Sequence, residues 1–401
     1  MRAHSSAWRA PLVTIRDLPR RWDIFCVAID NYGDVGVAWR LARQLAAEHG
    51  IAVRLFVDAL VALAHMVPQV DPSREEQVVR DVDVRRWGGP QQDLLPAAIS
   101  GMGEVVIEAF GCGLPDAYLA GMGERRAQPL WINLEYLSAE EWIEGCHRLA
   151  SRQPRLPLTR HFFFPGFTPA TGGLLRERDL FAQRDAFRAQ RTVQSALSRI
   201  LKIETPAPET LKVSLFCYPH APIGTLLDAW AGGGHAVFCI VPEGVASAAI
   251  RAWASGAPTT SSEALRRGRL TIAPVPFLAQ DDYDKLLWAC DLNFVRGEDS
   301  LVRGQWAARP LVWHCYPQPD AAHLSKLDAF LARYTRGLAP ATSATYVEFA
   351  HAWNAGQAAL AWEALARCLP ALRAHAEAWA GELGTQPDLA SNLVKFASDL
   401  V

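Results

Sequence analysis

The sequence CVAIDNYGDVGVAWRLARQLAAEHG, residues 26–50, carries an apolar run into a loop and then into a long amphipathic segment. Residues 23–29 have the composition of a buried strand, and residues 36–49 show the apolar spacing of a helix. A strand that runs directly into a helix is typical of a βαβ unit, and such units build parallel sheets. The loop between them holds two carboxylates, Asp30 and Asp34, where many folds of this kind bind a phosphate.

This loop does not have the composition of a phosphate-binding turn. Gly33 and Gly36 permit a tight turn between strand and helix, but DNYGDVG does not match the dinucleotide-binding pattern GxGxxG. Asp30 and Asp34 would repel a phosphate, whereas they suit a cation or the removal of a proton. An alternative is that Asp34 caps the helix and stabilises its positive end. The loop alone leaves both interpretations open.

Outward from this unit, strand and helix patterns alternate along nearly the whole chain. The further strand candidates are 52–57, 104–110 and 129–136 and, beyond a helical stretch at 178–203, residues 211–218, 235–241, 270–277, 291–297 and 310–316. At 401 residues the chain is too long for one ordinary core. The pattern predicts an α/β fold of two doubly wound, Rossmann-like domains that bind ligands in a cleft at the carboxyl ends of their strands.

The predicted domains divide near the middle of the chain. Residues 22–185 form the expected N-terminal domain and residues 186–385 the expected C-terminal domain. Residues 151–177 are rich in Pro and Gly and predict a loop-rich boundary or lid, whose centre HFFFPGF is either a recognition surface or an anchor into the core. Residues 1–21 are Arg-rich without the apolar segment of a signal peptide, and a disordered extension is predicted there.

Composition argues against several classes of protein. A net charge of -2 offers no electrostatic footprint for nucleic acid, so no nucleic-acid partner is predicted. No uncharged apolar run approaches the roughly 18 residues of a membrane span, so no membrane partner is expected. Eight cysteines are scattered without a CxxC pair, which argues against a disulfide framework or a metal cluster. Such cysteine usage favours a reducing, cytoplasmic location.

A second candidate site lies in NFVRGEDSLVRGQWAARPLVWHCYPQ, residues 293–318. Ser300 opens a predicted helix there, and the free backbone N–H groups at a helix start bind phosphate oxygens. Arg296 and Arg303 would add positive charge, while the two acids of RGEDS project from the turn. A simple capping motif, with Ser300 as the N-cap, explains this segment equally well.

Aromatic residues mark the ends of two more predicted strands. Phe216 and Tyr218 lie at one strand end, and Phe277 and Tyr283 flank Gln280 at another. Aromatic rings can stack on a nucleobase, and the Gln280 amide can hydrogen-bond one. Taken singly, each ring is better explained as part of the core. Their shared place at strand carboxyl ends favours a nucleotide site.

These segments together resemble one known family. The strings that carry the resemblance are DNYGDVGVAWRLARQL, IEAFGCGLP, WINLEYLSAEEWIEGCHRL, FFFPGFTPATGGLLRE, FCYPHAP and FVRGEDSLVRGQWA. They are similar to those of the protein-arginine rhamnosyltransferases of the EarP family, which modify elongation factor P. The resemblance runs from about Trp22 to the C-terminus, and WINLEYLSAE and RGEDS are long, unusual strings.

The resemblance implies a GT-B glycosyltransferase that transfers L-rhamnose from TDP-β-L-rhamnose to an arginine of elongation factor P. It implies inversion at the sugar carbon, no metal and no other cofactor. The N-terminal domain would bind the acceptor, the C-terminal domain the sugar nucleotide, and a C-terminal helix near 386–401 would cross back onto the first domain. The family's catalytic acids fall on Asp30, Asp34 and Glu298. Its sugar-nucleotide residues fall on Phe216, Tyr218, Phe277, Gln280, Tyr283, Arg296, Asp299 and Ser300.

The paired aspartates suit an arginine acceptor. A guanidinium is cationic and a poor nucleophile, so two carboxylates would attract it, hold its planar fork and direct one nitrogen at the sugar carbon. Our hypothesis makes Asp34 the general base and Asp30 the orienting, charge-balancing group. The N–H groups around Ser300, with Arg296, would stabilise the leaving TDP. Glu298 is expected to contact the rhamnose or the ribose.

Two other functions remain open at this point. A GT-B transferase could act on a lipid or small-molecule acceptor, or the chain could bind a nucleotide without turnover, its acids serving only as caps. The release of TDP with and without elongation factor P distinguishes these functions. A dehydrogenase is disfavoured because no dinucleotide-binding pattern follows any predicted strand.

Overall fold

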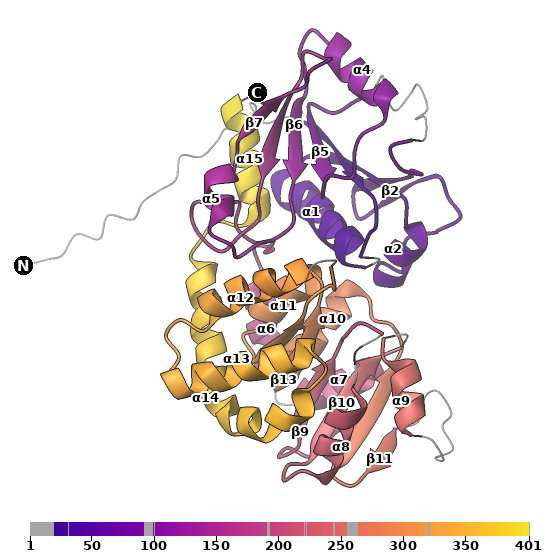
Figure 1. Ribbon diagram of the computed structural model, residues 1–401. Coiled ribbons are helices and arrows are strands. Elements are labelled where there is room, and N and C mark those ends of the chain that lie inside the picture. The colour runs from indigo at the N-terminus through magenta and orange to yellow at the C-terminus, as the bar shows by residue number, and fades with distance from the viewer. Residues whose placement is uncertain are drawn as a thin grey trace, which may run out of the picture.

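The computed structural model describes residues 20–30, 32–91, 99, 101–190, 193–219, 221, 223–243, 245–254, 264–318 and 321–400. These residues form two α/β domains, each built around a mainly parallel sheet (Figure 1). The predicted fold class, two Rossmann-like domains, is therefore confirmed. Of the predicted extension 1–21, residues 1–19 lie outside the described part of the chain, and Arg21 already opens the first strand.

The first domain holds an eight-stranded sheet in the order β3-β4-β2-β1-β5-β6-β8-β7. Its strands are β1 Arg21–Cys26, β2 Ala52–Val57, β3 Glu76–Val79, β4 Val82–Arg86, β5 Val105–Ala109, β6 Leu130–Leu134, β7 Ala150–Arg152 and β8 Thr159–Phe163. The inner strands run parallel, and the edge strands β3 and β7 pair antiparallel with their neighbours. Its helices include α1 Gly33–His49, α2 Leu60–Met66, α4 Asp116–Glu124 and α5 Trp142–Cys146.

The opening βαβ unit follows from local sequence. Every residue of β1 after Arg21 is buried, as expected for a central parallel strand that is covered on both faces. The following helix, α1, stops at Gly50, whose φ of 66° is left-handed and lets its N–H bond to the Ala46 carbonyl. The chain then enters β2, which pairs in parallel with β1.

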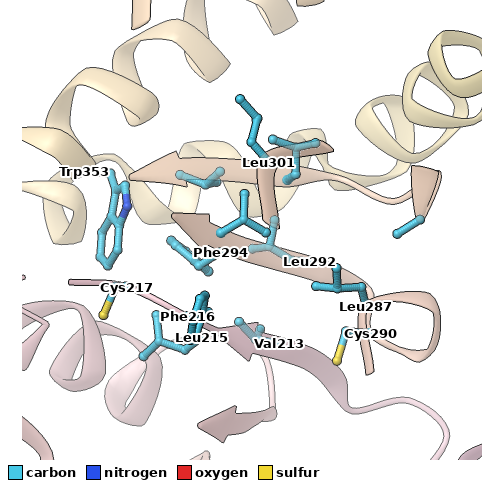
Figure 2. Close-up of a cluster of buried hydrophobic side chains, with 14 of the residues drawn as sticks. Val213, Leu215, Phe216, Cys217, Leu287, Cys290, Leu292, Phe294, Leu301 and Trp353 are labelled. Atoms are coloured by element: carbon cyan, nitrogen blue, oxygen red, sulfur yellow. The ribbon is translucent and has the colours of Figure 1, made fainter. Parts of the chain in front are cut away.

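The second domain holds a six-stranded sheet in the order β11-β12-β10-β9-β13-β14. Its strands are β9 Leu211–Leu215, β10 Val237–Pro242, β11 Leu265–Arg267, β12 Leu270–Val275, β13 Leu292–Arg296 and β14 Leu311–His314. Its helices are α6 Leu180–Ala189, α7 Val193–Leu201, α8 Gly224–Gly232, α9 Ser247–Trp253, α10 Gln280–Ala289, α11 Asp299–Trp306, α12 Ala322–Tyr334, α13 Pro340–Asn354, η3 Ala358–Ala361 and α14 Trp362–Gly384. Figure 2 shows the core of this sheet, where Val213 and Leu215 of β9 lie beside Leu292 and Phe294 of β13.

The segment 151–177 differs from its prediction as a loop-rich boundary or lid. Its first half contains β8, which joins the first sheet next to β6, and the end of the edge strand β7. Phe163, Phe164 and Phe167 are all buried. Three of the four phenylalanines of HFFFPGF therefore anchor it into the core, and a recognition role for the half-buried Phe162 and the rest of the segment stays a prediction. The hairpin was hidden in the sequence because its strands are only three and five residues long and Pro154 and Pro157 lie in the loop between them.

The chain passes to the second domain after β8 and returns after α14. Residues 164–179 lead to α6, which packs on α10 of the second domain, and the predicted division at 185 falls inside this helix. The last helix, α15 Leu389–Leu400, contacts α1, and its Leu393 and Phe396 join the core of the first domain. Figure 1 shows α15, in yellow, beside the strands of the first sheet. The chain therefore ends on the domain in which it begins.

Candidate active site

The loop after β1 meets loops from the second domain at Asp30. The Tyr218 hydroxyl donates a hydrogen bond to Asp30 Oδ2 at 2.7 Å. Gly297 lies close to the same carboxylate, since a Cβ built on it would be 2.5 Å from Asp30 Oδ2, and its φ of 61° is left-handed. Burial raises the pKa of Asp30, although the Tyr218 hydrogen bond and the Arg296 charge oppose the shift. The domains thus touch at a predicted catalytic acid.

Asp34 closes the β1–α1 loop rather than capping the helix. Its Oδ2 accepts the backbone N–H groups of Ile29 at 2.7 Å and of Asp30 at 2.8 Å. The Tyr136 hydroxyl lies close to the Asp34 side chain and acts to lower its pKa. The N-cap of α1 is Tyr32, which makes no side-chain capping bond. Burial raises the pKa of Asp34 while these hydrogen bonds oppose the rise, so the carboxylate is held by its loop and by a neighbouring phenol.

Two pockets adjoin at Asp30, which lines both. The first, here called the aromatic pocket, encloses about 520 Å³, partly open to solvent. The predicted residues that line it are Phe216, Phe277, Gln280, Tyr283, Arg296, Asp299 and Ser300. The second, the carboxylate pocket, encloses about 860 Å³, also partly open, and its lining includes Asp34, Tyr136, Glu298, Tyr316 and Lys326. Seven of the eight predicted sugar-nucleotide residues thus line the aromatic pocket, Tyr218 lines neither pocket, and the three predicted catalytic acids all line the carboxylate pocket.

The aromatic pocket combines flat rings with a cation. Phe216 and Tyr283 lie with their ring centroids 5.3 Å apart. The Arg296 guanidinium carbon is 4.7 Å from the ring centroid of Phe216 and 4.7 Å from that of Tyr218. Stacking of this kind holds the guanidinium in place and leaves its N–H groups available for an anion.

Gln280 brings an unpaired acceptor to the same pocket. Its Nε2 donates to the Gly36 carbonyl at 3.2 Å. Its Oε1 is buried and has no hydrogen-bond partner among the residues that the structure describes. The side chain is only 5% exposed. A buried carbonyl oxygen without a partner is costly, so this atom indicates a place where a ligand N–H or O–H completes the site.

The turn before α11 differs from its predicted form. The helix begins at Asp299 with Glu298 at the N-cap, so Ser300 lies one residue further inside than predicted. The Ser300 hydroxyl accepts the Arg296 N–H at 2.9 Å and donates to the Arg296 carbonyl. This side chain therefore closes the β13–α11 turn and is not the N-cap. A serine that bonds to the backbone four residues earlier and a serine that caps a helix occur in similar sequences. Composition alone therefore does not tell the two apart.

Glu298 faces the carboxylate pocket, away from the residues that line only the aromatic pocket. The Leu137 N–H donates to Glu298 Oε2 at 2.9 Å. Burial, together with the nearby Asp34 carboxylate, raises the pKa of Glu298 to about 8. An acid next to a bound diphosphate would be unfavourable, and its place beside Asp34 avoids that difficulty.

A cluster of ion pairs behind the site joins the domains. Arg40 of α1 hydrogen-bonds Asp284 of α10 at 3.2 and 3.1 Å and lies 2.7 Å from Asp299. Arg303 of α11 binds the same Asp284 at 3.0 and 2.6 Å and Glu177 at 2.6 Å. The Arg40 and Arg303 side chains are 1% and 2% exposed. These charges are shielded from water and hold α1, α10 and α11 together.

This cluster corrects one prediction and was otherwise missed. Arg303 was expected to add positive charge for a diphosphate, but its guanidinium binds Asp284 and Glu177 instead. Arg40 was not singled out at all. The sequence did contain a sign of its role. Arg40 lies inside the apolar VAWRLA part of a predicted helix, and a buried charge there needs an oppositely charged partner.

The first domain also supplies residues that sequence reasoning did not place at the site. Tyr32 and Met66 line the aromatic pocket, and the Tyr32 ring lies 4.5 Å from Phe277. Tyr136 lines the carboxylate pocket and follows directly after β6. The unusual string WINLEYLSAE was recognised as part of the resemblance, yet no role was derived for its residues.

Three further observations bear on the chemistry. Among the residues that the structure describes, no group of three or more His, Cys, Asp or Glu side chains is arranged to hold a metal ion. All eight cysteines are free thiols. Within the described helices, none combines the length and apolar character that crossing a bilayer requires.

The known proteins that this chain resembles are described as rhamnosyltransferases. The family model of elongation factor P (EF-P) rhamnosyltransferase EarP matches residues 22–398. The protein-arginine rhamnosyltransferase of Pseudomonas aeruginosa is 48% identical over 379 residues, covering 94% of this chain and 99% of that protein. The protein of the same name from Pseudomonas putida is 47% identical over 379 residues, covering 94% of this chain and 98% of that protein.

Solved structures show the same relationship. A structure described as the structural basis for EarP-mediated arginine glycosylation of translation elongation factor EF-P is 35% identical, with a TM-score of 0.67 and coverage of 95% and 99% of the two chains. The spinosyn rhamnosyltransferase SpnG, at 13% identity and a TM-score of 0.50 over 95% and 100% of the chains, shares the GT-B fold. Because the family model, the curated relatives and the solved structure all agree, the chain belongs to the EarP family of elongation factor P rhamnosyltransferases.

Proposed function

We propose that this protein transfers L-rhamnose from TDP-β-L-rhamnose to an arginine side chain of elongation factor P, with inversion at the sugar carbon and with Asp34 as general base. The observation that carries the proposal is the position of Asp30. This carboxylate lines both the aromatic pocket and the carboxylate pocket and accepts a hydrogen bond from Tyr218 of the second domain. A sugar nucleotide in one pocket and a cationic acceptor in the other would meet at this residue.

The aromatic pocket has the chemistry that a thymidine diphosphate needs. Phe216 and Phe277 offer apolar faces to a pyrimidine ring, and the partnerless Gln280 Oε1 would accept the ring N–H. Arg296 supplies a fixed cation for the diphosphate. The first amides of α11, beside Ser300, add N–H groups and the positive end of a helix. Together they would stabilise the charge that develops on the leaving TDP.

The carboxylate pocket has the chemistry that an arginine needs. Asp34 and Asp30 carry neighbouring carboxylates, and a guanidinium would bind them through charge-assisted hydrogen bonds. Binding two reactants in adjoining pockets replaces a bimolecular encounter with an oriented one, which is where much of the rate gain would arise. The lining also includes apolar side chains such as Leu137, Leu301 and Trp313, but the two carboxylates favour a cationic acceptor over a neutral lipid.

The proposed reaction is a single displacement. An acceptor guanidinium nitrogen forms a bond to the sugar carbon as the bond from that carbon to the TDP oxygen breaks, so TDP leaves with the electron pair. The nitrogen becomes acidic as its new bond forms, and Asp34 then takes its proton. Asp30 orients the guanidinium and balances its charge. Glu298, protonated near neutral pH, would hydrogen-bond the sugar.

The proposal also covers the need for a metal ion and the cellular location of the reaction. We include a metal-independent transfer, in which Arg296 and the amides of α11 serve the diphosphate. We also include a cytoplasmic place of action, in line with eight free thiols. Transfer that disappears in EDTA and returns with a divalent cation would contradict metal independence.

The decisive experiment is intact-mass analysis of elongation factor P after incubation with this protein and TDP-rhamnose. The expected result is a gain of one deoxyhexose, located on an arginine by peptide fragmentation. NMR of the product would show the α-anomeric configuration if transfer inverts. Release of TDP that does not depend on elongation factor P, with no mass gain, would contradict the proposed acceptor. Binding of TDP-rhamnose without any release of TDP would favour the non-catalytic alternative.

A further inference from the structure

The string WINLEYLSAE, residues 131–140, contacts both acids of the carboxylate pocket. The turn just after β6 makes the contacts. The Tyr136 hydroxyl lies close enough to the Asp34 side chain to lower its pKa, and the Leu137 N–H donates to Glu298 Oε2 at 2.9 Å. One short turn therefore binds an acid of its own domain and an acid of the second domain.

Two neighbours fix the Tyr136 ring. It stacks on Phe110, with ring centroids 4.5 Å apart and an angle of 20° between the planes. The Lys326 ammonium lies 5.7 Å from the centroid of the same ring. Phe110 has a φ of 59°, a left-handed conformation that is unfavourable for a bulky residue, and its N–H is bonded to the Leu134 carbonyl at 2.6 Å. The ring that supports Tyr136 is thus kept in place by backbone contacts.

The two acids of the pocket differ in what binds them. Asp34 accepts hydrogen bonds from two backbone N–H groups of its own loop and lies close to the Tyr136 hydroxyl, and all three groups favour the ionised carboxylate. Glu298 accepts the Leu137 N–H, and burial with the nearby Asp34 raises its pKa to about 8. Near neutral pH the proton of this pair therefore resides on Glu298. Burial, with Asp34 nearby, holds the pKa of Tyr136 far above its usual value, so the phenol remains a hydrogen-bond donor.

Other charged and titratable groups face the pair as well. Asp30 and Cys26 lie on the same side of the pocket as Asp34, and His323 and Lys326 line the pocket from α12. None of these four changes when the Tyr136 hydroxyl is removed. The effect of that one group can therefore be measured against a constant background.

We propose that Tyr136 is a positioning residue of the transfer reaction: its hydroxyl keeps Asp34 ionised and oriented toward the acceptor, while Glu298 carries the proton. The inference rests on the proposed function, in which Asp34 accepts the proton of the guanidinium. Tyr136 does not itself exchange a proton in the reaction. It acts through Asp34.

The test is the variant Tyr136→Phe, which retains the ring on Phe110 and removes only the hydroxyl. Loss of the neighbouring hydroxyl, which favours the ionised form, raises the pKa of Asp34, so the acid limb of the kcat–pH profile moves to higher pH. A shift of one pH unit lowers kcat by about tenfold at the foot of that limb and changes it little on the plateau. KM for TDP-rhamnose stays within about twofold, because the aromatic pocket is unchanged.

Tyr334→Phe is the matched control. Tyr334 lies in the core of the second domain, and its hydroxyl has no partner among the described residues. This variant should leave the acid limb where it is in the unmodified protein. If Tyr136→Phe leaves the acid limb where it is in the unmodified protein, even with kcat lowered equally at every pH, the hydroxyl does not keep Asp34 ionised and the inference is overturned.

A second measurement does not require turnover. Carbon-13 NMR of aspartate carboxyls, with Asp34 assigned by its loss in Asp34→Asn, should show a higher pKa for Asp34 in Tyr136→Phe than in the unmodified protein. An unchanged pKa overturns the inference even if transfer to elongation factor P is confirmed. A raised pKa with no transfer at all would instead locate the failure in the proposed function.

Discussion

Arg40 Nε of α1 lies 2.7 Å from Asp299 Oδ1 at the start of α11, and this ion pair joins the helices that follow the two loops of the proposed catalytic acids. Asp34 lies on α1, and Glu298 immediately precedes Asp299. The distance between the two acids of the carboxylate pocket therefore depends on a buried contact behind them. When one partner of such a pair is removed, the other is left as an uncompensated charge.

Arg40→Met tests this dependence. We expect the free energy of unfolding in urea to fall by about 3–5 kcal/mol, because the Asp299 carboxylate loses the cation that it pairs with and Asp284 keeps only Arg303. Arg80→Met is the control, since Arg80 is 37% exposed and pairs with Asp281 at the surface. It should cost less than about 1 kcal/mol. Equal costs for both variants would show that the buried cluster does not stabilise the arrangement of the domains.

Asp34→Asn and Asp30→Asn should abolish rhamnose transfer. Asp34→Asn removes the proposed base, and Asp30→Asn removes a charge that balances the guanidinium. Because Asp34 does not line the aromatic pocket, isothermal titration should show near-normal TDP-rhamnose binding by Asp34→Asn. A folded Asp34→Asn protein with near-normal turnover would rule out Asp34 as the base.

Gly297→Ala should remove activity without unfolding the protein. Its Cβ would lie 2.5 Å from Asp30 Oδ2, so the carboxylate must move, and a displacement of this size can cost about 100-fold in kcat. Gly337→Ala is a close control, because Gly337 also has a positive φ, of 84°, but has open space around its Cβ. Both variants should lose roughly 1 kcal/mol of stability through backbone strain. Similar activity in the two would contradict the close approach at Asp30.

Glu298→Gln should change how stability depends on pH. The pKa of Glu298 is about 8 in the folded protein against an ordinary value of 4.5. Between these values the folded state binds more protons than the unfolded state, so this group lowers stability progressively as the pH rises through that window. Glutamine cannot ionise and removes the penalty. Thermal unfolding should therefore show a Tm advantage of the variant that grows from pH 5 to about pH 8, and a constant difference would exclude the raised pKa.

Phe396→Ala should destabilise the first domain selectively. Phe396 belongs to α15 at the end of the chain, yet its ring lies 5.6 Å from Phe163 of β8. Loss of a buried phenylalanine costs about 3–5 kcal/mol. Hydrogen exchange should accelerate in the first sheet more than in the second. Leu400→Ala, at a residue that is 52% exposed, is the control and should change neither.

The sequence was most informative about strands, helices and loops, because their formation depends on residues that are close together in the chain. Alternating apolar strands and amphipathic helices predicted two Rossmann-like domains, because strand and helix periodicities are set over a few residues. The loops at strand ends were predicted correctly as well, so Asp30, Asp34 and Glu298 stood out in the sequence as candidate site residues. The β7–β8 hairpin was missed because its strands are short and the loop between them contains Pro154 and Pro157.

Contacts between distant residues could not be derived in the same way. The Tyr218–Asp30 bond joins residues 188 positions apart, and the Arg40–Asp284 bonds join residues 244 positions apart. Neither residue of such a pair carries a local pattern that identifies the other. Composition alone did not distinguish Ser300 as an N-cap from Ser300 as the closing group of a turn.

By itself, the sequence determined the fold, the family and the set of acids and aromatic residues at the strand ends. Only the tertiary structure decided that Glu298 faces Asp34 across the carboxylate pocket and that one turn after β6 binds both. The physical reason is that periodicity and turn chemistry act within a few residues, whereas the environment of an acid depends on which domain surfaces pack together.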